Sequence, residues 1–215
     1  ALAFEHLAIA CRDLKALDWP WAALRVTVTR GTAPRGYAPP PEPLPRTVIS
    51  AAILDRDASQ PLHPATLCVA DIALADQPRL AGVKHLNRLE QVLAAQQAVA
   101  RGADEALTLD QRGDIACTGS GNLFAVAGRD IITPPLQRCG IRGTRRQLLI
   151  ERWAPALGLT VREETLSMAL AASADEVFYT NALIGVRAVT RIDDLAWPAG
   201  PVTDALFQQY AGALL

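Results

Sequence analysis

The most distinctive reactive group in this sequence is the amine of Lys84. The chain contains 21 basic residues, and all of them except Lys15 and Lys84 are arginines. A guanidinium stays protonated and is a poor nucleophile, so arginine supplies surface charge but cannot replace a lysine that reacts through its amine. Lys15 lies among charged residues, which is typical of a surface position. Lys84 is therefore the candidate for amine chemistry, with chance retention as the alternative.

A second pattern with chemical meaning is the glycine-spaced segment 139–146, which leads into a predicted helix. Gly143, Thr144 and Arg145 stand where unpaired backbone N–H groups and the helix dipole favour an anion such as phosphate. Asn181 and Ala182 follow a predicted strand and offer a second set of polar groups. An exposed basic helix start and an ordinary turn would have the same residue types, so both readings stay open.

Arg35 and Tyr37 lie in a loop bounded by glycine and proline, where a guanidinium beside a phenol could hold a carboxylate. The pattern is short, so it is a weak indication. His85 follows Lys84 directly, and adjacent residues of a helix point apart, so the sequence favours a structural role for it.

Composition excludes several classes of function. The net charge of −1 gives no reason to expect nucleic acid or an acidic membrane surface as partner, and no apolar stretch has the length of a membrane helix. The four cysteines show neither metal-ligand spacing nor the density of a disulfide scaffold, which favours a reducing cytoplasm. The chain does not begin with methionine, so we expect its true start to be missing.

Hydrophobic periodicity predicts the elements that must position these groups. Strands are expected at 23–29, 46–54, 66–74, 104–109, 113–117, 121–127, 129–133, 159–163, 175–180 and 184–190. Helices are expected from Lys84 to about Gly102, from Gly143 to about Leu157, at 165–172 and near 203–211. Short strands joined by tight turns indicate a mixed α/β fold with mostly antiparallel sheets and few crossover helices, rather than a doubly wound parallel sheet.

The segment from Ala81 to Leu93, AGVKHLNRLEQVL, closely resembles the aminodeoxychorismate lyase family. The resemblance continues through Ala103–Leu107, Gly121–Phe124, Gly140–Gly143 and Asn181–Leu183, and covers roughly residues 25 to 190. The KHLNRLE run is specific to the lyases. Branched-chain and D-amino-acid aminotransferases share the later landmarks but differ around the lysine.

This resemblance implies the fold of type IV pyridoxal-phosphate enzymes, with domains expected at 1–78 and 79–215, and a cytoplasmic homodimer. It implies conversion of 4-amino-4-deoxychorismate to 4-aminobenzoate and pyruvate, a step towards folate. Lys84 matches the lysine that holds pyridoxal 5′-phosphate as a Schiff base. Gly143, Thr144 and Arg145 match the helix start that holds the phosphate, and Asn181-Ala182 match its other side. Arg35 and Tyr37 match the loop that grips a substrate carboxylate in the related D-amino-acid enzymes.

Two departures from the family pattern stand out. Cys117 takes the place of the usual glutamate beside the pyridine nitrogen of the cofactor, and a neutral thiol does not keep that nitrogen protonated. The family's N-terminal entry strand and its phosphate-contacting arginine have no counterpart, and residues 1–22 resemble the helix that follows them. The alternatives are an aminotransferase of the same fold, or a catalytically impaired relative that acts as a binding module.

Overall fold

The computed structural model describes residues 2–15 and 17–214, and it divides into two compact units. The first unit ends at Ala58, and the second begins at Ser59. The domains expected from the sequence, 1–78 and 79–215, stay a prediction. The second compact unit includes strand β3 (Ala65–Val69), because β3 pairs in parallel with two other strands of that unit.

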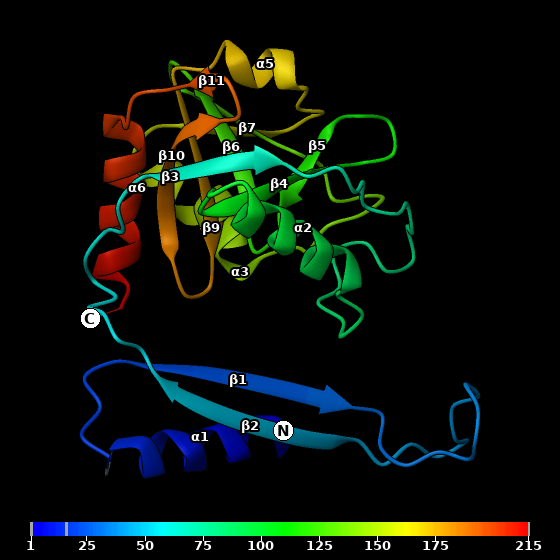
Figure 1. Ribbon diagram of the computed structural model, residues 1–215. Coiled ribbons are helices and arrows are strands. Elements are labelled where there is room, and N and C mark those ends of the chain that lie inside the picture. Colours follow the sequence, from blue (N-terminus) through cyan, green and yellow to red (C-terminus); the bar gives the residue numbers. More distant parts are fainter. Residues whose placement is uncertain (1, 16, 215) are drawn as a thin grey trace. The chain divides into compact units, whose positions relative to one another are not determined.

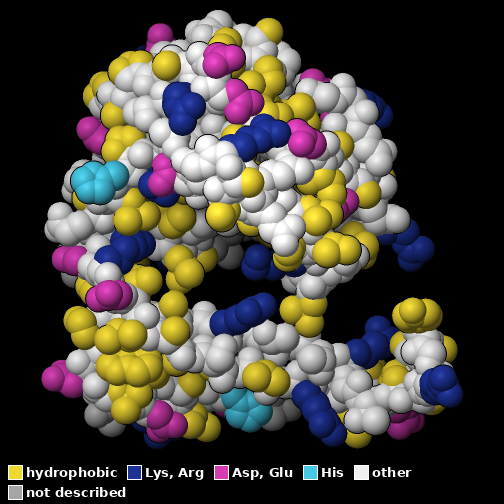
Figure 2. Space-filling model, in the orientation of Figure 1, with side chains coloured by type: hydrophobic (Ala, Val, Ile, Leu, Met, Phe, Trp, Pro, Cys, Tyr) yellow, Lys and Arg dark blue, Asp and Glu magenta, His cyan; other side chains and the backbone are white. Residues whose placement is uncertain are grey.

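The first unit consists of a helix and a two-stranded hairpin (Figure 1). Its elements are α1 (Leu2–Lys15), β1 (Ala22–Thr29) and β2 (Arg46–Ile53), so both expected strands are confirmed. The hairpin is antiparallel from Ala22↔Ile53 to Thr29↔Arg46. Figure 2 shows hydrophobic side chains on the surface of this unit, and Val28 and Val48 are more than half exposed. The hairpin and helix therefore leave much of their apolar surface uncovered.

The second unit is built on one large mixed sheet. Its strands run in the order β5-β4-β3-β10-β9-β6-β7-β8, and β11 pairs with β10. Besides β3, they are β4 (Glu105–Leu109), β5 (Ile115–Thr118), β6 (Asn122–Ala127), β7 (Asp130–Thr133), β8 (Thr160–Glu163), β9 (Glu176–Asn181), β10 (Gly185–Ile192) and β11 (Leu195–Ala196). The three parallel pairs are β10 with β3, β3 with β4, and β7 with β8; the other pairs are antiparallel, as the sequence predicts.

The sheet must curl, because β5 stands at one end of the strand order and continues through a tight turn into β6, an interior strand. The backbone N–H of Thr118 donates to the carbonyl of Gly121 at 2.9 Å across this turn. A Cβ at position 121 would lie 2.6 Å from the Thr180 carbonyl oxygen on β9, so only glycine fits there. This close approach brings the β5–β6 turn against the end of β9.

Four helical segments cover the sheet (Figure 1). They are α2 (Leu89–Ala100), the continuous run formed by α3 (Thr144–Leu148), the π-helical η1 (Leu149–Trp153) and α4 (Ala154–Ala156), then α5 (Met168–Ala172) and α6 (Pro201–Gly212). No helix within the described residues is long and apolar enough to cross a membrane.

Two expectations about the second unit are wrong: the strand expected at 66–74 ends at Val69, and the helix expected from Lys84 begins later. Helix α2 begins at Leu89, so Lys84 and His85 lie in the loop before it and the argument that they point apart on a helix does not apply. The buried face of α2 is formed by Ala94 and Ala98 rather than by its leucines. Small residues allow the helix to pack closely on β4, while Leu89 remains exposed.

The two largest apolar clusters pack on the sheet, and one of them includes α6. Phe124 of β6 stacks on Phe178 of β9 with ring centroids 4.9 Å apart. The buried carboxylate of Glu176 accepts bonds from the backbone N–H groups of Val202 and Thr203, at 3.0 and 2.8 Å, and so caps the start of α6. Helix α6 is thereby held in place by a strand residue remote from it in sequence.

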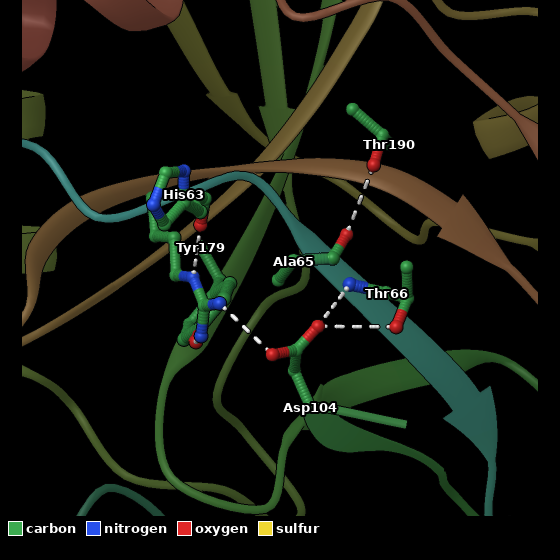
Figure 3. Close-up of polar contacts among 7 residues, drawn as sticks. His63, Ala65, Thr66, Asp104, Tyr179 and Thr190 are labelled. Carbon is green, nitrogen blue, oxygen red and sulfur yellow. Dashed lines mark hydrogen bonds and ion pairs between the residues drawn. The ribbon is translucent and has the colours of Figure 1, made fainter. Parts of the chain in front are cut away.

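A polar network joins neighbouring strands in the middle of the sheet (Figure 3). Asp104 accepts bonds from the backbone and side chain of Thr66, and pairs with Arg187 of β10 at 3.1 Å. Arg187 also donates to the buried hydroxyl of Tyr179 and to the carbonyl of His63. Burial by itself would raise the pKa of Asp104, but these bonds outweigh it and lower that pKa. The network therefore keeps β3, β4, β9 and β10 in register.

Candidate functional site

A cavity of about 540 Å³ lies in the second unit, where the curled sheet brings four segments together. The segments are the loop before α2, the β5–β6 turn, the start of α3, and the β9–β10 turn. The lining residues are Gly82, Lys84, Arg88, Gln91, Cys117–Asn122, Gly140–Arg145 and Thr180–Leu183. Within this lining there is no aspartate or glutamate, whereas four side chains are basic.

The cavity brings together seven of the nine residues predicted from the sequence. Those that line it are Lys84, Cys117, Gly143, Thr144, Arg145, Asn181 and Ala182. Arg35 and Tyr37 belong to the first unit, in the exposed connection between β1 and β2. Their assignment to a substrate carboxylate therefore stays a prediction.

The loop that carries Lys84 is fastened to the segment that leads into α3. The N–H of Gly82 donates to the Gly140 carbonyl at 2.9 Å, and the N–H of Arg142 returns a bond to the Gly82 carbonyl at 3.0 Å. Arg138 adds ion pairs with Asp76, at 3.4 Å, and with Asp110. Because backbone and side chains both join these segments, the lysine and the helix start form one framework.

The start of α3 is shaped to leave its backbone donors available. Its N-cap residue, Gly143, makes no side-chain capping bond, so the first N–H groups of the helix have no intrahelical partner. Asn122 donates from Nδ2 to the Ile141 carbonyl at 2.8 Å, and its Oδ1 occupies the space that a Cβ on Gly143 would need. Only glycine at position 143 allows Asn122 to approach the start of α3 this closely. The backbone N–H groups of Gly143, Thr144 and Arg145 then form a set of donors in the cavity lining.

The three arginines of the lining, Arg88, Arg142 and Arg145, have no carboxylate partner within the described residues. The guanidinium of Arg145 lies 5.1 Å over the Tyr210 ring of α6, and its buried Nε has no hydrogen-bond partner. Arg88 donates to the backbone carbonyls of His85 and Val83, at 2.9 and 3.2 Å. Burial lowers the pKa of Arg88 below its ordinary value, a sign of its desolvation. Arg88 was not among the residues predicted from the sequence, although it lies in the KHLNRLE segment that carries the family resemblance.

The end of β9 adds a buried hydroxyl with no partner. Thr180 is 1% exposed, and its Oγ1 makes no hydrogen bond in the described structure. Asn181, by contrast, uses its Oδ1 to accept from the N–H groups of Leu183 and Ile184, which fixes the β9–β10 turn. A buried orphan hydroxyl beside a cavity suits a polar ligand atom. Thr180 is thus the ligand candidate at this edge, with Asn181 shaping the turn.

Cys117 closes the cavity from β5 and is almost fully buried. The hydroxyl of Thr108 donates to the Cys117 carbonyl at 2.8 Å and lies 3.4 Å from its Sγ. Burial raises the pKa of the Cys117 thiol, so the group is neutral at physiological pH. This side of the cavity therefore presents a hydrogen-bonding but uncharged atom.

The donor set fits a phosphate-bearing aldehyde cofactor. The helix start offers backbone N–H groups, Thr180 offers an unpartnered hydroxyl, and Arg145 offers charge, while Lys84 supplies the amine. In the part of the chain that the structure describes, no group of three or more His, Cys, Asp or Glu is placed to hold a metal ion.

Comparison with known proteins gives a consistent family. The Amino-transferase class IV model matches residues 3–192. An aminodeoxychorismate lyase from Vibrio harveyi is 31% identical, covering 88% of this chain and 74% of that one. A branched-chain-amino-acid aminotransferase from Salmonella typhimurium is 29% identical, covering 97% of this chain and 70% of its own length.

Solved structures agree with this result. A 4-amino-4-deoxychorismate lyase from Pseudomonas aeruginosa is 38% identical and superposes with a TM-score of 0.79, covering 89% of this chain and 71% of that one. A branched-chain amino acid aminotransferase from Escherichia coli is 26% identical with a TM-score of 0.82, covering 97% of this chain and 71% of its own length. The chain therefore belongs to the class IV aminotransferase family of pyridoxal-phosphate-dependent enzymes, and it has the mixed α/β architecture of fold type IV.

Proposed function

We propose that this protein is a pyridoxal-phosphate-dependent lyase that converts 4-amino-4-deoxychorismate to 4-aminobenzoate and pyruvate. The observation that carries the proposal is the cavity in which Lys84, an uncapped helix start and a neutral thiol lie around one space. The lyase-specific KHLNRLE run and the two lyase relatives support the same reading.

The residues that would hold the cofactor follow from the site. Lys84 would bind it covalently through its amine, and the N–H groups of Gly143, Thr144 and Arg145 would bind its phosphate. Asn181 and Ala182, with the Thr180 hydroxyl, would bound the phosphate on its other side. When bound, this cofactor supplies an electron sink that stabilises negative charge on the carbon attached to the substrate nitrogen.

Lys84 would then act in proton transfer. When it is not bonded to the cofactor, its amine would take the proton from the ring carbon that bears the nitrogen. The protonated amine can return that proton to the departing enolpyruvyl oxygen. The bond between the ring carbon and that oxygen breaks, the ring becomes aromatic, and the released enolpyruvate tautomerises to pyruvate. Aromatisation supplies driving force that a transamination lacks.

Cys117 favours elimination over transamination. A carboxylate in its place would keep the pyridine nitrogen protonated and maximise the electron sink, whereas the buried thiol is neutral. An elimination driven by aromatisation requires less of that sink. We therefore assign Cys117 to the ring-nitrogen side of the cofactor.

The second candidate function is that of a branched-chain or D-amino-acid aminotransferase, because a branched-chain relative is about as similar to this chain as a lyase relative is. A catalytically impaired binding module is the third reading.

In all three readings we propose a cytoplasmic homodimer, with Arg35 and Tyr37 as the clamp for a substrate carboxylate.

The first experiment tests Lys84. The purified protein should show a visible absorbance band from the bound cofactor, and borohydride reduction should fix the cofactor mass on the peptide that contains Lys84. Lys84→Ala and Lys84→Arg should lose the covalent adduct and all turnover, because neither side chain forms the bond. The matched control is Lys15→Arg, which changes an exposed lysine of the first unit. An adduct that survives in Lys84→Ala would overturn the assignment.

The second experiment separates the reactions. With 4-amino-4-deoxychorismate the protein should release pyruvate and 4-aminobenzoate in equal amounts, without a keto-acid acceptor. Faster conversion of leucine or D-alanine with 2-oxoglutarate would favour the aminotransferase reading. Cofactor binding without either activity would favour the binding module.

A further inference from the structure

The cavity carries more positive charge than the phosphate of one cofactor requires. Lys84, Arg88, Arg142 and Arg145 all line it, and no acidic side chain does. Arg145 lies beside the helix start, where the phosphate is assigned, and Arg88 is directed to backbone carbonyls. That leaves Arg142 without a role in the proposed function.

Arg142 is anchored by its backbone and unpaired at its side chain. Its N–H donates to the Gly82 carbonyl, which fixes the residue beside the loop that carries Lys84. A Cβ built on Gly82 would lie 3.5 Å from Arg142 Cβ and 3.9 Å from its Nε, so the side chain runs over Gly82. Its guanidinium makes no hydrogen bond or ion pair within the described residues. It is therefore a cation held at the cavity without a carboxylate of the same chain.

Arg142 and Lys84 are the two exposed basic residues of the lining. Arg142 is exposed, whereas Arg88 and Arg145 are partly buried. The Arg142 guanidinium has no partner within the described residues, so it can bind a carboxylate that a substrate carries outside the part held by Lys84 and the helix start. Arginine binds a carboxylate through two parallel N–H bonds, which makes it a selective partner for that group.

We propose that Arg142 is a specificity-determining residue that selects amino substrates bearing a second carboxylate remote from the amine. The proposal rests on the function proposed above, and it narrows the substrate to a dicarboxylate. Simple monocarboxylic amino acids place their single carboxylate next to the reacting carbon, so they leave Arg142 unpaired. The substrate of the proposed lyase carries two carboxylates.

Binding of inert ligands to the cofactor-loaded protein tests this role without relying on turnover. The diacid probe is 3-(carboxymethoxy)benzoate, and the monoacid probes are 3-methoxybenzoate and phenoxyacetate, each of which lacks one of its carboxylates. Calorimetry should show that the wild type prefers the diacid. Arg142→Gln should weaken diacid binding by roughly ten- to a hundredfold, the effect of losing a charge-assisted bond, and should change at least one monoacid by less than about twofold.

The control variant is Arg152→Gln, because Arg152 is an exposed arginine outside the cavity lining. It should bind all three probes as the wild type does. Raising the salt concentration should weaken the diacid preference of the wild type more than that of Arg142→Gln, since an exposed ion pair is screened.

The outcomes separate this proposal from the one before it. An unchanged diacid affinity in Arg142→Gln, or an equal loss for the diacid and both monoacids, would overturn the selective role. The visible cofactor band reports loading in each variant, so a failure of cofactor binding is recognised separately. Diacid selectivity that depends on Arg142 in a protein without lyase activity would refute only the proposed reaction.

Discussion

The side of the cavity formed by α3 and the end of β9 presents unpaired donors, whereas the side formed by β5 presents a neutral thiol. On the first side, the start of α3 has no side-chain cap, and Thr180 Oγ1 and Arg145 Nε have no hydrogen-bond partner in the described structure. On the second, Cys117 is satisfied by Thr108 and packs with Leu74 and Ala116. Changes on the donor side should therefore alter cofactor binding, and changes on the thiol side should alter stability and reactivity.

The largest expected effect comes from placing a charge on the thiol side. Cys117→Glu puts a carboxylate among apolar neighbours, so the cofactor-free protein should lose about 3 kcal/mol of unfolding free energy. With cofactor bound, a protonated ring nitrogen would pair with that carboxylate and part of the loss should return. Urea unfolding with and without cofactor measures both values.

The same variant should shift the visible absorbance of the bound cofactor and its pH dependence, and slow transamination of simple amino acids should rise more than the lyase rate. Cys117→Ser is the control, because it keeps a neutral hydrogen-bonding group. If Cys117→Glu destabilises both forms equally and leaves the spectrum unchanged, Cys117 does not face the ring nitrogen.

A methyl group on the donor side should disturb cofactor binding. In Gly143→Ala the new Cβ competes with Asn122 Oδ1, whose amide is held by Ile141, so the helix start must shift. We expect a loss of about 1–3 kcal/mol in stability and a weaker cofactor complex. Gly212→Ala, near the end of α6, is the matched control because a Cβ there meets no atom within 4 Å. Equal cofactor affinity in both variants would contradict the assignment of the cofactor phosphate to the start of α3.

Local signals in the sequence predicted most of the strands. Alternating β-branched runs mark β1 and β2, and the glycines around Gly143 and Gly121 mark places where backbones approach closely. Composition and the family resemblance both indicated Lys84, and the structure added the groups that surround it.

Features that depend on tertiary packing were not predictable. The start of α2 was placed too early because apolar periodicity continues through Leu86, which is exposed in the loop. Pairing of β3 with β10 joins residues far apart in sequence, so no local pattern reveals that β3 belongs to the second unit. Thr180 Oγ1 and Arg145 Nε are buried without a hydrogen-bond partner in the described structure. This depends on which groups the fold places around them, and the sequence does not show that.

A smaller effect should follow from removing the orphan hydroxyl. Thr180→Val deletes a buried polar atom that has no partner, so the cofactor-free protein should keep its stability or gain up to about 1 kcal/mol. Cofactor affinity should fall by roughly three- to tenfold if the hydroxyl binds the phosphate. Thr133→Val is the contrasting control, because that hydroxyl donates to the Leu123 carbonyl at 2.8 Å and its removal should destabilise the fold. Lower stability in Thr180→Val would mean that its hydroxyl is already paired.

The smallest expected effect concerns the cysteines of the thiol side as pH rises. Burial raises the pKa of Cys139 from 9.0 to about 12 and also raises that of Cys117, so both thiols keep their protons in the folded protein under alkaline conditions where the unfolded chain loses them. Their contribution to stability is complete below about pH 9 and is lost as pH rises towards 12. The urea midpoint of the cofactor-free wild type should therefore fall more between about pH 8 and pH 10 than that of Cys139→Ala. Because a thiolate is the reactive form, iodoacetamide at about pH 8 should label the exposed Cys11 well before either of these thiols. Rapid labelling of Cys117 in the folded protein would show that the β5 side opens to solvent, and the contrast between the two sides of the cavity would then be lost.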